Sequence, residues 1–211
     1  MAIVNKTYTV FDCDDVLLDL TQFVTDTLGL PVMTEFSYRE SGQYNAQDTQ
    51  AITDAYSSAN VFYQVPFYEG ADKIMQLEEY GTEVHICTRS FTDAVTEVKK
   101  QRLPGHTKVP LAHIDFQRGY GEGKKFPEYT DIAIDDCIDN LTGLPPTTVK
   151  ILKLRPTNQR SNRFYFKHQL HCFRDLTGII DFVRVLHTTG LIWNMNWRSH
   201  QFYGVGGESD G

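Results

Sequence analysis

Short apolar runs rich in β-prone residues alternate along much of the chain with segments in which apolar residues recur at helical spacing. Val95 and Val98, for example, fall on one side of a helix predicted from about Ser90 to Gln101, where Ser90 and Asp93 resemble a capping box. Strands that alternate with helices predict an α/β fold, a Rossmann-like parallel sheet with right-handed crossovers. The predicted strands are Thr7–Asp12, Glu83–Cys87, Leu111–Phe116, Asp131–Ile134 and Thr148–Leu154. The other predicted helices span about Val16–Leu28, Glu69–Tyr80 and Phe173 to just before Gly190.

The alternation fails between Pro31 and Pro66, where the chain is polar and aromatic, with one helix expected near Ala46–Ala59. This stretch is either a small insertion that covers a site or a long loop whose helix packs on the core. Taking the first interpretation, residues 1–30 and 67–190 form the Rossmann-like core and residues 31–66 form a small, mainly helical cap. Residues 191–211 are a C-terminal extension whose Gly-rich end we expect to be disordered.

Composition narrows the class of protein. A chain of 211 residues is long enough for one sizeable core, and a formal net charge of −7 argues against a general nucleic-acid binder. No apolar run approaches the roughly 20 residues of a membrane span, and the first residues lack the apolar core of a signal peptide. Four cysteines without CxxC spacing make a zinc cluster improbable, so we expect reduced thiols and a cytoplasmic protein without a membrane partner.

Polar side chains stand at the ends of three predicted strands. Asp12 and Asp14 follow the first strand, Thr88 follows the second, and Asp135 and Asp136 follow the fourth. In parallel sheets, ligands bind beyond the carboxyl ends of the strands, so a single site could collect all of these groups. Acids between two apolar elements are costly unless they are paired or bind a metal, which favours a functional site over a solvated surface.

These groups suit phosphoryl transfer. Mg²⁺ prefers a few carboxylates together with waters or a phosphate oxygen, and Asp12, Asp14 and Asp135 could supply them. A carboxylate can also attack phosphorus directly, while a second acid protonates the leaving alcohol. Thr88 precedes a helix whose first amides could bind phosphate, and Lys124 or Lys125 offers a cation.

The ordered set Asp12-Cys13-Asp14, Thr88, a lysine, and Asp135-Asp136 resembles the four motifs of the haloacid dehalogenase-like (HAD) phosphatases. More narrowly, the segments Pro66–Ala71, Val84–Thr88 and Ile132–Asp136 look like the 5'(3')-deoxyribonucleotidase branch. The resemblance covers about Thr7 to Leu141. It extends more loosely to residues 154–183, where Arg155-Pro156-Thr157-Asn158 is similar to a proline–asparagine turn of those enzymes.

The resemblance implies a role for each group. Asp12 would be the nucleophile that forms an aspartyl phosphate, and Asp14 the general acid and base. The carboxylates of Asp12 and Asp135 and the backbone carbonyl of Asp14 would bind Mg²⁺, with Asp136 in support. Thr88 would hold the phosphate of a nucleoside 5'-monophosphate, the expected substrate, under the cap.

The remaining assignments are less specific. Lys125 lies ten positions before Asp135, the spacing associated with this branch, and is therefore preferred to Lys124 as the catalytic lysine. Arg89 and Ser90 follow Thr88 and are expected to contact the phosphate, although the branch has Ser-Pro there. Asp15 stands where the family usually has Gly. Because an extra acid beside a phosphate site demands a partner, Arg89 is our candidate for that partner.

Two alternatives stay open. From Asn140 to Arg174 the chain has no acid, and the aromatic run Phe164–Phe166 interrupts its basic residues, a pattern that single-strand binders use. The protein could therefore be a phosphatase of polynucleotide 3' ends. The second alternative, from another class, is a catalytically silent HAD-like scaffold that binds proteins through its surface. The basic residues of the acid-free stretch are Lys150, Lys153, Arg155, Arg160, Arg163, Lys167 and Arg174.

Trp193 and Trp197 either cover the core or form a subunit contact in a homodimer.

Overall fold

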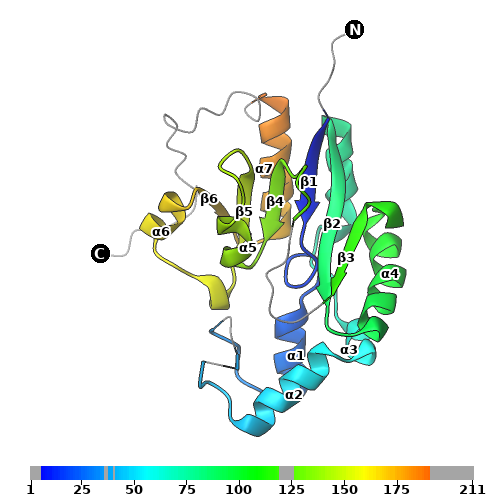
Figure 1. Cartoon of the computed structure of the whole chain (residues 1–211), viewed down its shortest axis with the longest axis vertical. Coiled ribbons are helices and arrows are strands. Elements are labelled where there is room, and N and C mark those ends of the chain that lie inside the picture. The colour runs from blue at the N-terminus through cyan, green and yellow to red at the C-terminus, as the bar shows by residue number, and fades with distance from the viewer. Residues whose placement is uncertain (1–5, 36–37, 40, 119–125, 191–211) are drawn as a thin grey trace.

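The computed structural model describes residues 6–35, 38–39, 41–118 and 126–190, and these form a Rossmann-like α/β fold around one parallel sheet (Figure 1). Six strands pair in the order β3-β2-β1-β4-β5-β6, and every pairing is parallel. The fold class predicted from the sequence is confirmed. The strands are β1 (Thr7–Phe11), β2 (Thr82–Ser90), β3 (Ile114–Arg118), β4 (Ile132–Asp135), β5 (Val149–Lys153) and β6 (Leu170–Phe173).

The strand order reverses direction between β1 and β4. The chain builds outward from β1 through β2 to β3, then returns to the other side of β1 to place β4, β5 and β6. In doubly wound sheets the crossover connections leave on opposite faces at such a point, which opens a crevice at the carboxyl ends of the two strands. The ends of β1 and β4 are therefore the place where this topology favours ligand binding.

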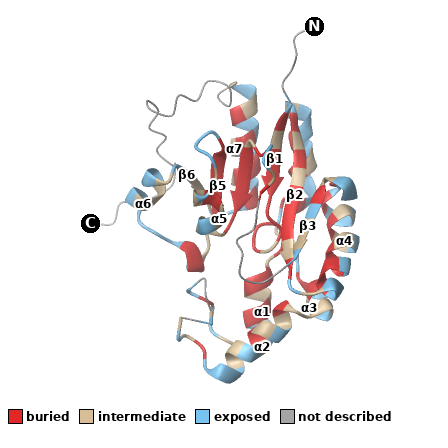
Figure 2. Ribbon diagram, in the orientation of Figure 1, coloured by how far each residue is buried: buried red, intermediate tan, exposed pale blue. Residues whose placement is uncertain are grey.

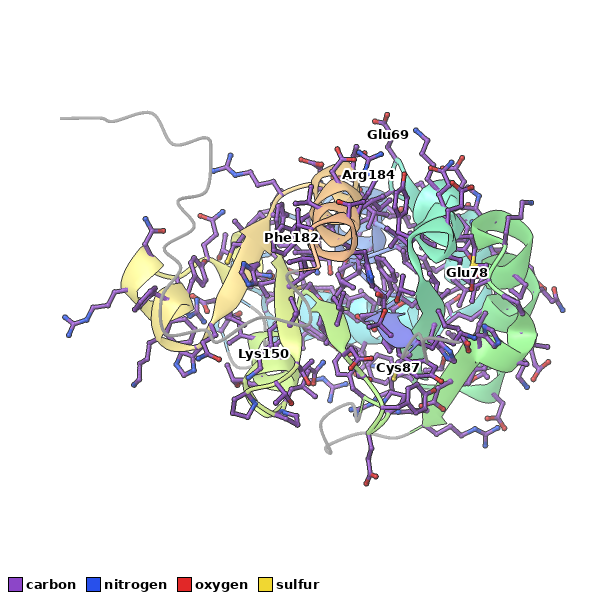
Figure 3. All side chains as sticks on the ribbon, turned by 90° about the horizontal axis from the view of Figure 1, so that it is seen from above. Glu69, Glu78, Cys87, Lys150, Phe182 and Arg184 are labelled. Atoms are coloured by element: carbon purple, nitrogen blue, oxygen red, sulfur yellow. The ribbon has the colours of Figure 1, made fainter. Side chains whose placement is uncertain are left out.

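Helices cover both faces of the sheet, and each face has its own apolar core. On one face η1 (Ala71–Tyr80), α4 (Asp93–Thr107) and α7 (Leu176–Thr188) pack against the larger cluster of buried side chains. The other face carries a smaller cluster with α5 (Ile138–Thr142) and α6 (Asn162–Lys167). Figure 2 shows the inner strands largely buried, whereas the edge strands β3 and β6 are more exposed. In Figure 3, Phe182 and Arg184 of α7 lie on one side of the sheet, while Cys87 and Lys150 lie on the other.

The stretch between Pro31 and Pro66 contains two helices where the sequence predicted one. Helix α2 (Ala46–Tyr56) ends at Ser57, and α3 (Ala59–Gln64) begins after Ser58, whose hydroxyl accepts a hydrogen bond from the Val61 amide. With α1 (Leu20–Leu28), they lie beyond the carboxyl ends of β1 and β2 (Figure 1). The division into core and cap stays a prediction.

Several boundaries differ from the sequence-based expectations. Helix α1 begins at Leu20 because the amides of Leu17 and Leu18 both donate to the Cys13 carbonyl, forming a tight turn. Ser90 belongs to β2, and Thr92 is the N-cap of α4, so the predicted capping box is wrong. Short 3-10 segments occupy η2 (Leu111–His113) and η3 (Pro156–Asn158), and β6, α5 and α6 were not anticipated.

The long helices do not have the character of membrane spans. Among the described residues, no helix combines the length and the apolar composition that crossing a bilayer requires. Trp193 and Trp197, and with them the expected subunit contact, lie outside the described residues.

Candidate active site

Asp12 occupies the first position after β1 and is held between two strands. Its amide donates to the carbonyl of Ile134 in β4 over 2.8 Å, so the chain leaves the sheet at the reversal point. The Cys13 carbonyl accepts the hydrogen bonds that form the next turn, and Asp14 and Asp15 lie within this turn. Asp12 is 8% exposed, a level of burial that a carboxylate tolerates only when its charge is compensated.

A compact carboxylate cluster forms where β1 meets β4. One oxygen each from Asp12, Asp135 and Asp136 lie within 4.8 Å of one another, and all three residues are buried. Asp135 is oriented by the Cys137 amide at 2.7 Å and by the Asn140 side-chain amide at 3.1 Å. Oxygen ligands at this spacing fit a hard divalent cation such as Mg²⁺. The side chain of Asp14 lies outside this cluster.

Lys99 provides the cation of the site. It comes from α4, is 1% exposed, and its Nζ donates to Asp14 Oδ2 at 2.7 Å, to Thr88 Oγ1 at 2.9 Å and to the Arg89 carbonyl at 2.7 Å. All three ammonium protons therefore have acceptors. Lys99 was not among the site residues predicted from the sequence, although its spacing was a signal, because a residue four after Val95 falls on the buried side of the helix.

Lys124 and Lys125, the lysines favoured by motif spacing, lie outside the described residues. The roles inferred for them from the sequence accordingly stay predictions.

The environment of Asp14 suits proton transfer. Burial raises the pKa of its carboxyl group, while the charge and hydrogen bond of Lys99 act in the opposite direction. Its Oδ1 atom is buried and has no hydrogen-bond partner among the described residues. A carboxyl group held this way keeps a proton more readily than a solvated one, as a general acid requires.

Asp15 pairs with Arg155, so the expectation that Arg89 is its partner is wrong. Arg155 Nη1 contacts Asp15 Oδ2 at 2.5 Å and Asp136 Oδ2 at 2.7 Å. Asp15 also accepts hydrogen bonds from the amide and the hydroxyl of Thr21. Its φ of 63° is a left-handed conformation that Gly adopts without strain and Asp tolerates better than most residues. The extra acid is thus neutralised by a residue about 140 positions away in the chain.

A tight turn delivers Arg155 to the cluster. The Asn158 side chain accepts from the Arg155 amide and donates to the carbonyls of Asp136 and Lys153, so it fixes the turn to both β4 and β5. Burial raises the pKa of Asp136 to about 7, with Asp15 and Asp135 adding to the effect and Arg155 opposing it. Bringing a cation to Asp12, Asp135 and Asp136 would relieve the same repulsion.

These groups open into a cleft of about 450 Å³ at the carboxyl edge of the sheet. Arg89 lines it, whereas Ser90 and Thr88 are buried behind it. Three aromatic rings form part of its wall, with Tyr56 between Tyr38 and Phe91 at centroid distances of 5.6 and 6.4 Å. The other lining residues are Asp12, Asp14, Asp15, Leu20, Thr21, Met33, Asp135, Asp136, Cys137, Asp139, Asn140, Arg155 and Thr157.

The acid-free stretch does not form one basic surface. Lys150 and Lys153 are buried in the sheet, and Arg155 is engaged at the cleft. Burial lowers the pKa of Lys153 to about 8, and its Nζ donates to the Asp15 carbonyl at 3.0 Å. The remaining four basic residues of the stretch are exposed, mostly around α6.

The chain matches no family model and no curated protein sequence. The solved structures of similar fold include three hydrolases. A haloacid dehalogenase-like family hydrolase from Streptococcus pneumoniae has a TM-score of 0.47 and 15% identity, covering 84% of this chain and 98% of its own. A haloacid dehalogenase-like hydrolase from Burkholderia xenovorans has a TM-score of 0.44 and 10% identity, and the match covers 83% of this chain and 98% of its own. A HAD-superfamily hydrolase of subfamily IA from Geobacter sulfurreducens has a TM-score of 0.43 and 11% identity, and the match covers 84% of this chain and 96% of its own. At these identities the likeness concerns the fold alone.

Proposed function

We propose that this protein is a Mg²⁺-dependent phosphomonoester hydrolase of the haloacid dehalogenase-like type, acting on nucleoside or deoxynucleoside 5'-monophosphates through an aspartyl phosphate. One observation carries the proposal. The carboxyl groups of Asp12, Asp14, Asp135 and Asp136 line one cleft. Behind it, the buried Lys99 of α4 donates to Asp14 and to Thr88 of β2.

The proposed reaction uses two carboxyl groups in succession. Asp12 attacks the phosphorus atom, and the bond to the nucleoside oxygen breaks as Asp14 gives that oxygen its proton. Asp14, now a carboxylate, takes a proton from a water molecule that attacks the aspartyl phosphate and restores Asp12. Lys99 offsets negative charge on the transferring group, and the hydroxyl of Thr88 positions it.

Mg²⁺ fits the donor set of Asp12, Asp135 and Asp136, since all three offer carboxylate oxygens close together. When bound, the ion neutralises charge on the phosphoryl oxygens. The hydrogen bonds that Asp135 accepts from Cys137 and Asn140 preset its direction. Arg155 limits the repulsion among these acids before the cation arrives.

The nucleoside part of the proposal rests on the aromatic wall. Phe91 is 40% exposed, and Tyr38 is partly exposed beside the buried Tyr56. An exposed aromatic ring in the wall of the cleft that also holds the carboxylates suits stacking on a base, because every base offers a π face. Tyr56 is fixed through its hydroxyl to Thr21, which also holds Asp15.

The test is phosphate release, with and without Mg²⁺, from a panel of ribo- and deoxyribonucleoside 5'-monophosphates and 3'-phosphorylated oligonucleotides. We expect Mg²⁺-dependent release from the mononucleotides and its loss in Asp12→Asn, which removes the nucleophile and keeps the shape. Glu128→Gln, at an exposed acid far from the cleft, is the matched control.

Two outcomes would overturn the assignment. Equal release by wild type and Asp12→Asn would mean that Asp12 is not the nucleophile. Release from the oligonucleotides alone would favour the polynucleotide 3'-phosphatase over the nucleotidase.

A further inference from the structure

A second group of side chains with metal-ligating atoms lies outside the lining of the cleft, in the first half of β2 and at the end of η2. Glu83 and His85 are two apart on this strand, so both point to the face that also carries Cys87. His113 ends η2 and immediately precedes Ile114, which pairs with Ile86. The register therefore brings His113 alongside the first half of β2.

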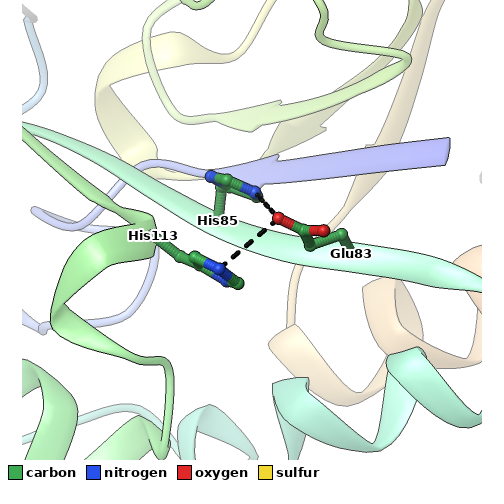
Figure 4. Close-up of side chains that lie close together, drawn as sticks. All are labelled: Glu83, His85 and His113. Atoms are coloured by element: carbon green, nitrogen blue, oxygen red, sulfur yellow. Dashed lines mark hydrogen bonds and ion pairs between the residues drawn. The ribbon is translucent and has the colours of Figure 1, made fainter. Parts of the chain in front are cut away.

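The three side chains converge on one carboxylate oxygen, as Figure 4 shows. Glu83 Oε1 lies 2.7 Å from His85 Nε2 and 3.5 Å from His113 Nε2, and the three atoms fall within 4.8 Å of one another. The two imidazole rings stack with centroids 4.6 Å apart and an interplanar angle of 9°. Both rings thus present the same nitrogen to the same place.

We propose that Glu83, His85 and His113 form a binding site for a divalent transition ion of the zinc type, which ties β2 to η2. Two imidazoles and a carboxylate are a donor set that Zn²⁺ accepts, with a water in the fourth position. Bond lengths near 2.0–2.1 Å place tetrahedral ligand atoms about 3.3 Å apart. The 3.5 Å separation already fits, and the 2.7 Å separation must open by about 0.6 Å.

The surroundings support ligation by His85. Its other ring nitrogen, Nδ1, lies 3.4 Å from the hydroxyl of Tyr129. A hydroxyl can accept as well as donate, so Tyr129 can accept from Nδ1–H in the tautomer that binds a metal through Nε2. The ring of Tyr8 packs edge-on against His85 at 5.7 Å. His113 Nδ1 is buried and has no hydrogen-bond partner among the described residues, so only His85 has its ring direction fixed in this way.

Lys6 is the group with which the ion must share Glu83. Its ammonium contacts Oε2, the oxygen that faces away from the two imidazoles, and its side chain is 59% exposed. Lys6 therefore leaves Oε1 available and is itself free to swing into solvent. This site is separate from the carboxylates of the cleft, which offer only oxygen and suit a harder ion.

The experiment is equilibrium binding of Zn²⁺ to the full chain in excess Mg²⁺, by competition with a chromophoric chelator, with Co²⁺ absorption as a second probe. We expect one Zn²⁺ per chain, tetrahedral Co²⁺ bands and a higher melting temperature with Zn²⁺. His113→Gln should weaken Zn²⁺ binding by at least about 100-fold, because losing even an outer partner of a ligating histidine costs about 10- to 100-fold. Gln can still donate to Glu83, so this variant keeps the apo contact.

Two controls separate this site from others. His168→Gln removes a histidine at the end of α6, and Asp135→Asn disables the carboxylate cluster of the cleft. Both should keep the Zn²⁺ affinity. Undiminished binding in His113→Gln, loss of binding in Asp135→Asn, or no stoichiometric binding by the wild type would each overturn the proposal. Far-UV circular dichroism of the apo variants shows whether a loss of affinity reflects unfolding.

Discussion

Lys99 carries a positive charge in a place that water does not reach. A buried ammonium group is costly unless its protons are accepted, and here a carboxylate, a hydroxyl and a carbonyl accept them. The charge of Asp14 is the main factor that raises the pKa of Lys99 against the lowering effect of burial. Lys99 therefore keeps its charge, and a fixed positive charge stands beside Asp14 and Thr88.

Replacing Lys99 by Gln should lower kcat by about 10²- to 10³-fold, the loss expected when one preorganised electrostatic group is removed. Steady-state phosphate release from the best mononucleotide measures the effect. Lys100→Gln is the control, because Lys100 is the next residue, is partly exposed and pairs with Glu97 at the surface. Similar kcat values in the two variants would contradict the catalytic role of Lys99. If Lys99→Gln lowered the melting temperature but not kcat, the role of Lys99 would be structural only.

At the scale of elements, α4 links the proposed catalytic groups to the stretch between Pro31 and Pro66. Lys99 points from this helix into the site, while Arg102 donates to the carbonyls of Phe62 and Val65 at the end of α3. Helix ends leave such carbonyls without partners, so Arg102 satisfies groups that would otherwise need water. At the other end of α4, the Thr92 hydroxyl donates to the Ser57 carbonyl between α2 and α3.

Arg102→Ala should therefore loosen α3 and reduce the free energy of unfolding by about 1–3 kcal/mol, the cost of charged hydrogen bonds left unmade. Hydrogen exchange should become faster in residues 59–65 and change little in the sheet. Arg118→Ala, which removes an exposed arginine paired with Asp93, is the comparison. Unchanged exchange in α3 would show that apolar packing alone holds it.

At the scale of the whole molecule, partly buried histidines make stability depend on pH. Burial lowers the pKa of His171 to about 4 and also lowers that of His187. Between the ordinary histidine value near 6.5 and about 4, the unfolded chain binds a proton at His171 that the folded chain does not. Stability from this residue is therefore complete above pH 6.5 and falls as the pH drops.

His171→Gln should flatten that dependence. The difference in unfolding free energy between wild type and variant should shrink by up to about 3 kcal/mol as the pH falls from 7 to 4. Urea unfolding at several pH values measures it, and the subtraction removes the contribution of carboxyl groups common to both proteins. A difference that does not change with pH would mean that His171 binds its proton at the same pH in the folded and the unfolded chain.

The local sequence pattern predicts the strands and the polar residues near their ends, but not the contacts between residues distant in the chain. The strand ends carrying Asp12, Thr88 and Asp135 follow from alternation, because a parallel sheet brings its carboxyl edges together whatever the strand order. Lys99 and Arg155 were not assigned to the site, since their contacts depend on how a helix is rotated and where a turn is anchored. The same non-local pairing explains why Asp15 was matched to the wrong arginine.

The sequence by itself determined the α/β class, the run of strands and the acids that follow them, because hydrophobic period and strand-end chemistry are properties of neighbouring residues. Only the tertiary structure decided the strand order, the partner of Asp15, the buried lysine and the meeting of Glu83, His85 and His113. Each of these joins residues distant in the chain, and their distances are set by packing across the sheet rather than by spacing along it.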